Sequence, residues 1–155
     1  MASQAQVPAP ALVAFASVGY LALLVSGLGF GSLIIDDDVI TTAGVSTLAA
    51  YVAAGISILA FAGFLLGPLR RDRPSFWFAA STALGATAVH ALTLGVAVLV
   101  SNGDLGVVGG VLSEVLVGWV SPLILVAALV ASWAAIAVRR TAAHRPRWPW
   151  EDDTP

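Results

Sequence analysis

Charged residues divide the chain into long apolar stretches. No Asp, Glu, Lys or Arg occurs within residues 1–35, 39–69, 74–103 or 115–138. Each stretch exceeds the about 20 apolar residues that span the hydrocarbon core of a bilayer. The strands of a membrane barrel would instead show alternating segments of about 10 residues, and the sequence has none. The pattern predicts an all-α, polytopic membrane protein with four transmembrane helices.

The predicted helices cover residues 11–35, 45–66, 76–100 and 107–138. The Gly-Pro and Asn-Gly pairs that follow the second and third helices are typical of helix ends and turns. The connections are short, which favours antiparallel neighbours, so we expect an up-down-up-down four-helix bundle. This transmembrane domain, residues 11–138, lies between a short N-terminal segment, residues 1–10, and a C-terminal tail, residues 139–155.

The last predicted helix is longer than a bilayer requires. Residues 107–138 would extend about 48 Å in a straight helix, at about 1.5 Å per residue. Pro122 lies inside it, and an interior proline removes a backbone hydrogen bond and kinks a helix. We therefore expect one helix, kinked near Pro122, whose first turns cap the bundle.

Arginine residues predict which helix ends are cytoplasmic. Basic residues occur only after the second and fourth helices, at Arg70, Arg71, Arg73, Arg139, Arg140, Arg145 and Arg147. The other connections carry acidic residues alone, at Asp36, Asp37, Asp38 and Asp104. The positive-inside rule therefore places both termini in the cytoplasm. Residues 1–10 contain no basic residue, which favours a retained first helix over a cleaved signal peptide.

Arginine and tryptophan residues gather near the predicted helix ends. Both side chains suit the headgroup region, where a polar or charged tip can meet water beside an apolar body. The predicted interfacial anchors are Arg70, Arg71, Arg73, Trp77, Trp119, Trp133, Arg139, Arg140, Trp148 and Trp150. The lipid bilayer is thus the first predicted partner.

Pairs of small residues four positions apart occur in three predicted helices. They are Gly27 and Gly31, Gly63 and Gly67, and Ser81 and Gly85. Such pairs let helix backbones approach closely in a bilayer. The stretch SGLGFGS around the first pair lacks the G-x-G-x-x-G spacing of a dinucleotide-binding turn and lies inside a span. We predict tight packing in the bundle, and packing with a second copy or with a membrane complex.

His90 and Glu114 form the candidate polar site of the membrane domain. His90 lies inside a span on a helix face of small residues, and it should point into the bundle because lipid cannot solvate it. A bend near Pro122 would bring Glu114 toward the level of His90 and could pair the two. A proton relay or substrate contact is the functional interpretation. The structural alternatives are a neutral histidine bonded to another helix and a glutamate at the interface.

The sequence offers no metal-binding or catalytic motif. It contains no cysteine, and the three consecutive carboxylates of IIDDDVI lack the spacing of a calcium-binding loop. No G-x-S-x-G turn accompanies the hydroxyl residues of the spans. We expect no cofactor, no metal and no enzymatic activity.

The tail RRTAAHRPRWPWEDDTP combines arginine, tryptophan and proline with an acidic end. Arginine and tryptophan suit the anionic inner leaflet, so we predict a membrane anchor. Docking of a cytoplasmic partner is the alternative, because extended proline-rich segments are ready ligands. The basic cluster is small and acids follow it directly, so we expect no nucleic-acid partner.

Two stretches, GFGSLIIDDDVI and RPRWPWEDD, resemble small, uncharacterised four-span integral membrane proteins of high-GC bacteria. The resemblance implies a location in the bacterial cytoplasmic (inner) membrane. It implies no activity, cofactor or site residue.

Two functions fit these features. The first is a non-enzymatic structural or accessory protein that packs with itself or with a membrane complex, as the small-residue faces indicate. The alternative is a small transporter or channel component that uses His90 and Glu114. Few polar residues line the spans, so protons or a lipid-like molecule would be its cargo.

Overall fold

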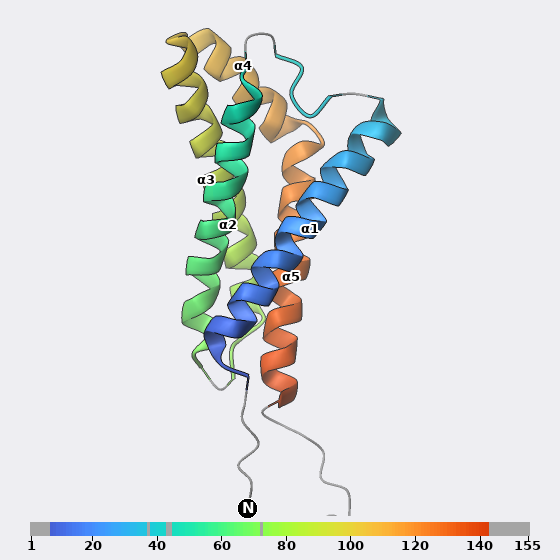
Figure 1. The fold of residues 1–155 in the computed structure, drawn as a ribbon, viewed down its shortest axis with the longest axis vertical. Helices are drawn as coiled ribbons and strands as arrows, with labels where there is room; N and C mark the ends of the chain where they lie inside the picture. The colour runs from blue at the N-terminus through green and yellow to red at the C-terminus, as the bar shows by residue number, and fades with distance from the viewer. Residues whose placement is uncertain (1–6, 37, 43–44, 72, 143–155) are drawn as a thin grey trace, which may run out of the picture.

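The computed structural model describes residues 7–142, except for residues 37, 43–44 and 72. In these residues it contains five α-helices and no strand, coloured from blue to red along the chain in Figure 1. The helices are α1 (Ala9–Ile35), α2 (Thr47–Leu69), α3 (Trp77–Asn102), α4 (Leu105–Val117) and α5 (Val120–Ala142). All except α4 are long and apolar enough to cross a membrane, by length and composition. For the described residues, the prediction of an all-helical fold with four apolar helices long enough to cross a membrane is confirmed.

Local contacts fix where several helices begin and end. The Ser46 hydroxyl caps the start of α2 by accepting a hydrogen bond from the backbone N–H of Leu48 at 3.2 Å. Asp104 caps α4 in the same way, with a 2.7 Å bond from the backbone N–H of Gly106. Gly103 ends α3 in the left-handed conformation, with φ 67°. These contacts satisfy backbone groups that have no partner inside the helix.

The four long helices lie side by side, and α4 lies obliquely across one end of them (Figure 1). α2 packs mainly on α3, α3 also contacts α5, and α1 packs on α5 and α2. The start of α1, the α2–α3 connection and the end of α5 lie at one end of the molecule, at the bottom of Figure 1. The α1–α2 connection and α4 lie at the opposite end. α1 is inclined to its neighbours, so its second half diverges from α2.

Small residues and a short polar chain hold the core together. The Tyr20 ring stacks on Phe61 with centroids 4.7 Å apart, and the Tyr20 and Ser57 hydroxyls lie 2.9 Å apart. Ser57 also donates to the carbonyl of Ala86 on α3, at 3.0 Å. α1, α2 and α3 are therefore joined by consecutive hydrogen bonds, with the Ser57 side chain fully buried. Polar groups inside a bilayer need such partners, because hydrocarbon offers none.

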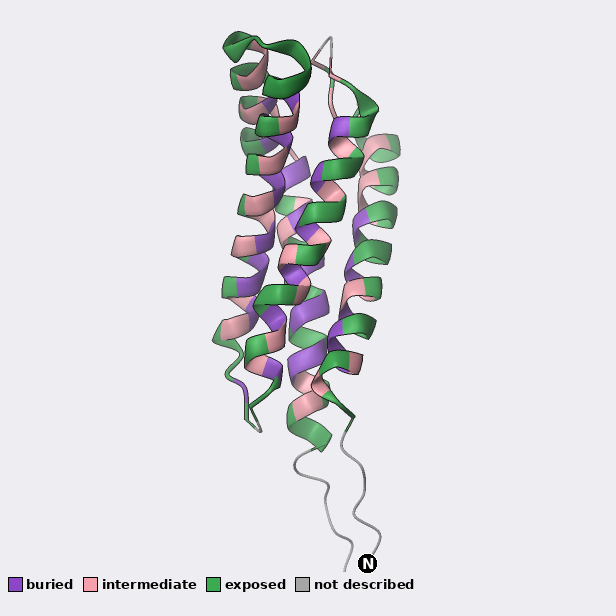
Figure 2. Ribbon diagram, turned by 60° about the vertical axis from the view of Figure 1, so that its left-hand side comes forward, coloured by how far each residue is buried: buried purple, intermediate pink, exposed green. Residues whose placement is uncertain are grey.

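The outward faces of the helices are apolar. In Figure 2 buried segments face the middle of the molecule and exposed segments face outward. Large apolar side chains on the outside include Leu33, Ile34, Trp77 and Val100, each between 77% and 84% exposed. A protein in water would rarely expose so continuous an apolar surface. The surface fits hydrocarbon on all sides of the four spans.

The last predicted helix is two helices in the structure, so the expectation of one helix kinked at Pro122 was wrong. The break lies at Gly118, which follows α4 in an extended conformation and whose N–H closes α4 on the Glu114 carbonyl at 2.9 Å. A Cβ atom at Gly118 would collide with that carbonyl oxygen. Pro122 instead lies in the first turn of α5, where its missing N–H leaves no hydrogen bond unmade.

The small-residue pairs divide into packed and outward-facing positions. A Cβ atom at Gly27 would collide with Leu123, one at Gly31 would lie 2.5 Å from the Trp119 ring, and one at Gly85 would lie 2.7 Å from the Phe64 ring. These three glycines allow close contact of α1 with α5 and of α3 with α2. The remaining residues, Gly63, Gly67 and Ser81, are exposed, and a Cβ at either glycine would meet no atom within 4 Å. Packing at those three positions within the chain was therefore a wrong expectation.

Candidate functional site

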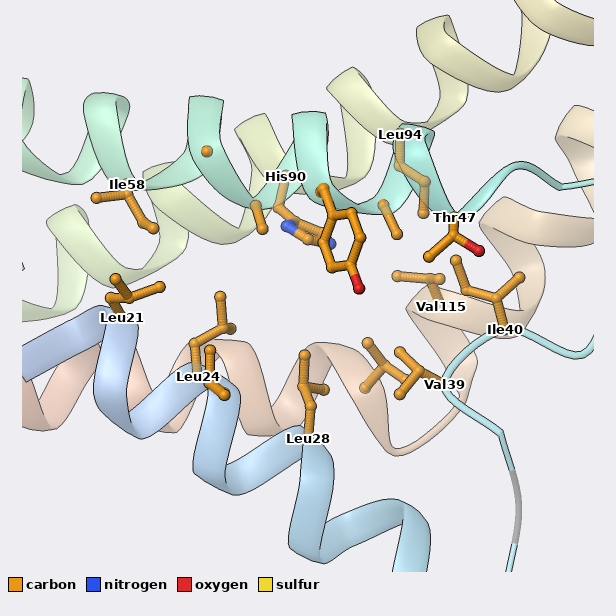
Figure 3. A pocket seen from close by; sticks show the side chains of 16 residues that line it. Leu21, Leu24, Leu28, Val39, Ile40, Thr47, Ile58, His90, Leu94 and Val115 are labelled. Atoms are coloured by element: carbon orange, nitrogen blue, oxygen red, sulfur yellow. The ribbon is translucent and has the colours of Figure 1, made fainter.

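A cavity of about 510 Å³ lies between α1 and α2 and is closed on its inner side by α3 (Figure 3). Its wall is formed mostly by aliphatic side chains from α1 and α2, with contributions from the α1–α2 connection, α4 and α5. The lining includes Leu21, Leu24, Leu28, Val39, Ile40, Ile58, Leu94, Val115 and Val120. The divergence of α1 from α2 creates this space, because the two helices separate toward the end that carries α4.

The cavity opens on the side of the bundle. Leu21, Val25 and Tyr51 line it and are nevertheless 43%, 63% and 71% exposed, so they form its rim. Leu24 and Leu94 also line the cavity but are only 2% and 0% exposed, so they lie at its bottom. The rim lies on the apolar outer surface of the spans, so the entrance faces the region that hydrocarbon would occupy.

His90 lies at the buried side of this cavity. It is near the middle of α3 and only 6% exposed, and its imidazole points from α3 toward the side chains of α1 and α2 (Figure 3). Its Nδ1 atom is buried and has no hydrogen-bond partner among the described residues. The expected inward orientation of His90 is therefore found, whereas the expected hydrogen bond to another helix is not. Most buried polar atoms in proteins have a hydrogen-bond partner. An atom without one therefore needs an explanation, and a functional role is one such explanation.

Glu114 binds the α1–α2 connection and makes no hydrogen bond to His90 in the described structure. One carboxylate oxygen accepts from the backbone N–H and the hydroxyl of Thr41, at 2.5 and 2.6 Å. The other accepts from the backbone N–H and the hydroxyl of Thr42, at 3.2 and 2.6 Å. The proposed His90–Glu114 pair is thus absent, because the carboxylate is fully occupied and α4 turns it toward the connection.

The environment of Glu114 favours its charged form. Partial burial alone would raise the pKa of its carboxyl group, but the hydrogen bonds from Thr41 and Thr42 outweigh burial and hold the pKa below its ordinary value. We call this group of Glu114, Thr41 and Thr42 the threonine–carboxylate clasp. It fixes α4 to the connection, and the adjacent residues Val39, Ile40 and Val115 line the cavity. The clasp therefore stabilises one wall of the cavity.

The opposite end of the molecule carries arginine and aromatic side chains in contact. The Arg140 guanidinium lies 4.7 Å from the Phe76 ring centroid, and that ring stacks on Trp133 at 6.1 Å. The Arg71 guanidinium lies 5.0 Å from the Phe78 ring. Arg139 also donates hydrogen bonds to the carbonyls of residues 7 and 71. Four predicted anchors, Arg71, Trp133, Arg139 and Arg140, thus lie at one end and tie the ends of α1, α2, α3 and α5 together.

The other predicted anchors have varied surroundings. Trp77 is 84% exposed and projects outward, and Arg70 and Arg73 are exposed in the α2–α3 connection. Trp119 instead is half-buried and packs over Gly31, so it fills space between α1 and α5. Trp148 and Trp150 lie outside the described residues.

Sequence reasoning missed two parts of this site. Thr41 and Thr42 lie in the α1–α2 connection, three and four residues after Asp38, and the pair of hydroxyls was the available signal for a carboxylate partner. The second is the cavity itself, which depends on the inclination of α1 and has no signature in the order of residues. No group of three or more His, Cys, Asp or Glu side chains that could hold a metal ion occurs within the described ranges.

The fold and the cavity together define a class: a small all-helical protein with four apolar helices suited to cross a membrane, and a lateral apolar cavity between two of them. The chain belongs to the family described as "Family of unknown function (DUF6121)", whose model matches residues 1–155. No curated protein and no solved structure matches the chain.

Proposed function

We propose that this protein is a non-enzymatic integral membrane protein that binds a lipid-like molecule in the cavity between α1 and α2. The observation that carries the proposal is a 510 Å³ apolar cavity whose rim lies on the outer face of the spans. Ligand sites are typically concave, mostly apolar and furnished with a few polar groups. A molecule dissolved in the bilayer would reach this cavity sideways, without crossing water.

The cavity favours a lipid-like cargo over protons. A proton path through the bundle would need polar groups within reach of one another, and Glu114 is bound to Thr41 and Thr42 instead of His90. The lining of the cavity contains one histidine, one tyrosine and one threonine among aliphatic residues. Such a lining supports binding or carrying of an apolar molecule and offers no acid–base pair for catalysis.

The distribution of charge supports a location in the bacterial inner membrane with both termini in the cytoplasm. Arg71, Arg139 and Arg140 lie at the end of the bundle where α1 begins and α5 ends, whereas Asp38 and Asp104 belong to connections at the other end. Under the positive-inside rule the arginine end is cytoplasmic, in an up-down-up-down arrangement of the four spans. The cavity then lies toward the outer leaflet.

Association with a second copy or with a membrane complex is the second candidate function. Gly63 and Gly67 face outward on α2 with no atom within 4 Å of a Cβ, so another helix could approach them closely. The C-terminal tail would add an interfacial anchor or a docking site for a cytoplasmic partner. Crosslinking in intact membranes, compared between the native chain and Gly63→Leu, tests this function. Loss of a dimer band supports it, and an unchanged monomer in both contradicts it.

Photolabelling tests the cavity proposal. The protein is placed in phosphatidylcholine nanodiscs with a long-chain alkane that carries a diazirine, and labelled residues are identified by mass spectrometry. Outward residues such as Leu59, 72% exposed, should be labelled by any probe in the bilayer. Labelling of Leu24 and Leu94 requires a probe inside the cavity. We expect both classes of label.

A matched pair of variants makes this test specific. Gly55 lines the cavity and Gly63 lies two turns away on α2, and a Cβ at either would meet nothing within 4 Å. Gly55→Phe should therefore obstruct the entrance and abolish labelling of Leu24 and Leu94, whereas Gly63→Phe should leave it intact. Absence of label at the two buried leucines in the native protein would contradict the proposal.

A further inference from the structure

We propose that the cavity selects uncharged amphiphiles, and that His90 recognises their single hydrogen-bonding group, a hydroxyl or a carbonyl. This inference rests on the proposed function and adds the chemical class of the ligand. The proposal rests on three properties of His90. It is more than nine-tenths buried, it lines the cavity, and one of its ring nitrogens has no hydrogen-bond partner among the described residues.

Two hydroxyl groups close to His90 in the fold have hydrogen-bond partners inside the chain. Thr87, one turn before His90 on α3, donates to the Ala83 carbonyl at 2.9 Å. Ser57, on the facing helix α2, donates to the Ala86 carbonyl at 3.0 Å. Each of these hydroxyls is satisfied inside the chain, whereas Nδ1 of His90 is not. An unpaired buried polar atom is costly, and a ligand that supplies its partner therefore gains affinity.

The imidazole is suited to one small neutral group. A neutral imidazole carries one N–H donor and one acceptor nitrogen, so it can donate to a carbonyl or accept from a hydroxyl. Thr47 and Tyr51 are the other polar side chains in the lining, and Tyr51 stands at the exposed rim. His90 is thus the polar group at the buried side of the cavity.

The charge of the lining decides between neutral and ionic ligands. Among the residues that the structure describes, none that lines the cavity is Asp, Glu, Lys or Arg. A phosphate or carboxylate headgroup would lose its hydration there and would find no cation in exchange. An uncharged headgroup loses less and gains the bond to His90. The ligand class is therefore a hydrocarbon body with one hydroxyl or carbonyl group.

The placement of the aliphatic residues gives the ligand an orientation. Figure 3 shows Leu21, Leu24 and Leu28 of α1 across the cavity from His90. The polar group lies against α3, and the hydrocarbon body extends along α1 toward the rim. A ligand that enters sideways from the bilayer therefore inserts its polar end first.

Two photoprobes of equal length test this selection, a long-chain alcohol and the corresponding alkane, each with a diazirine at the same carbon. Both are presented at equal mole fraction in phosphatidylcholine nanodiscs, and labelling at Leu24 and Leu94 is compared. One net hydrogen bond to His90 should favour the alcohol by about fivefold. The variants are His90→Leu, which removes the hydrogen bond, and His90→Gln, which retains a donor and an acceptor.

Thr93→Val is the control variant, because Thr93 lies on α3 outside the lining of this cavity. We expect the preference for the alcohol to vanish in His90→Leu, to survive in part in His90→Gln and to remain in Thr93→Val. Equal labelling by both probes in the native protein would overturn the inference and leave the proposed function standing. Labelling of the buried leucines by neither probe would overturn both. A preference that persists in His90→Leu would overturn the role of His90 alone.

Discussion

At the scale of single residues, polar side chains in this bundle fall into two groups. Tyr20, Ser57 and Ser132 are buried and bonded to other helices, and they join the spans to each other. In the part of the chain that the structure describes, the buried atoms without a partner are Ser17 Oγ, His90 Nδ1 and Ser121 Oγ, and of these residues only His90 lines the cavity. The first group stabilises the fold, and His90 is the residue that a ligand would satisfy. Substitutions at the two kinds of position should therefore differ in their effects on stability.

Ser57→Ala should destabilise the protein. It removes the link between Tyr20 and the Ala86 carbonyl, and a hydrogen bond of this kind contributes about 0.6 kcal/mol on average inside a membrane protein. The matched control is Ser81→Ala, since Ser81 is exposed and bonds only to the carbonyl of Phe78 in its own helix. Thermal unfolding in detergent should show a lower midpoint for the first variant and an unchanged one for the second. Equal midpoints would contradict the role of Ser57.

His90→Leu should leave the thermal midpoint unchanged or raise it. Replacement of an unpartnered buried polar group by an apolar side chain is close to neutral or stabilising, since no hydrogen bond is lost. The same unfolding experiment in ligand-free detergent measures this. A midpoint below that of the native protein would show that His90 holds the bundle together through a bond within the chain.

At the scale of helices, the contact of α1 with α5 depends on Gly31. A Cβ atom there would lie 2.5 Å from the Trp119 ring. Gly31→Val should therefore separate the two helices and destabilise the fold by about 1–3 kcal/mol, the usual cost of overpacking. Gly29→Val is the control, because it makes the same substitution on the same helix at an exposed position with no atom within 4 Å. Equal unfolding free energies for the two variants would contradict the close packing of α1 on α5.

The threonine–carboxylate clasp is the second feature that acts between helices, because it fixes α4 to the α1–α2 connection. The pKa of Glu114 is held below its ordinary value, so the folded state favours the carboxylate. Its contribution to stability is therefore fully present at neutral pH, above the ordinary pKa of about 4.3 for a glutamate, and is lost as pH falls through the depressed pKa of the folded protein. Hydrogen-exchange protection of the Thr41 and Thr42 amides should fall in the same window, relative to their intrinsic exchange rates.

Glu114→Ala should remove that protection at neutral pH, because both amides donate to the carboxylate. Asp104→Ala serves as the control, since Asp104 is an acidic cap of the same helix whose carboxylate accepts a hydrogen bond from Gly106 in that helix. Protected Thr41 and Thr42 amides in Glu114→Ala would show that the clasp does not hold the connection.

At the scale of the whole molecule, the four long apolar helices were predictable and the site was only partly so. Four charge-free stretches predict four apolar helices, because a bilayer demands about 20 apolar residues for each crossing. The break at Gly118 was misplaced to Pro122, since a proline in the first turn of a helix and one in its interior look alike in a sequence. His90 was identified from its type and position. The cavity beside it and the partners of Glu114 were not, because they depend on how α1 is inclined and where α4 turns.

The proposed role of His90 is to face a bilayer-accessible cavity and to bind a neutral amphiphile that enters it. Solid-state NMR of the protein in bilayers tests it directly, with ¹⁵N-labelled histidine and a long-chain alcohol labelled with ¹³C at the hydroxyl-bearing carbon. The chain contains two histidines, His90 and His144, so in His144→Gln the ring nitrogen signals come from His90 alone. We expect a short dipolar contact between the ¹³C label and a ring nitrogen of His90, and we expect it to be absent in Gly55→Phe. A His90 ring that contacts only protein atoms, with no alcohol signal at any loading, would contradict it.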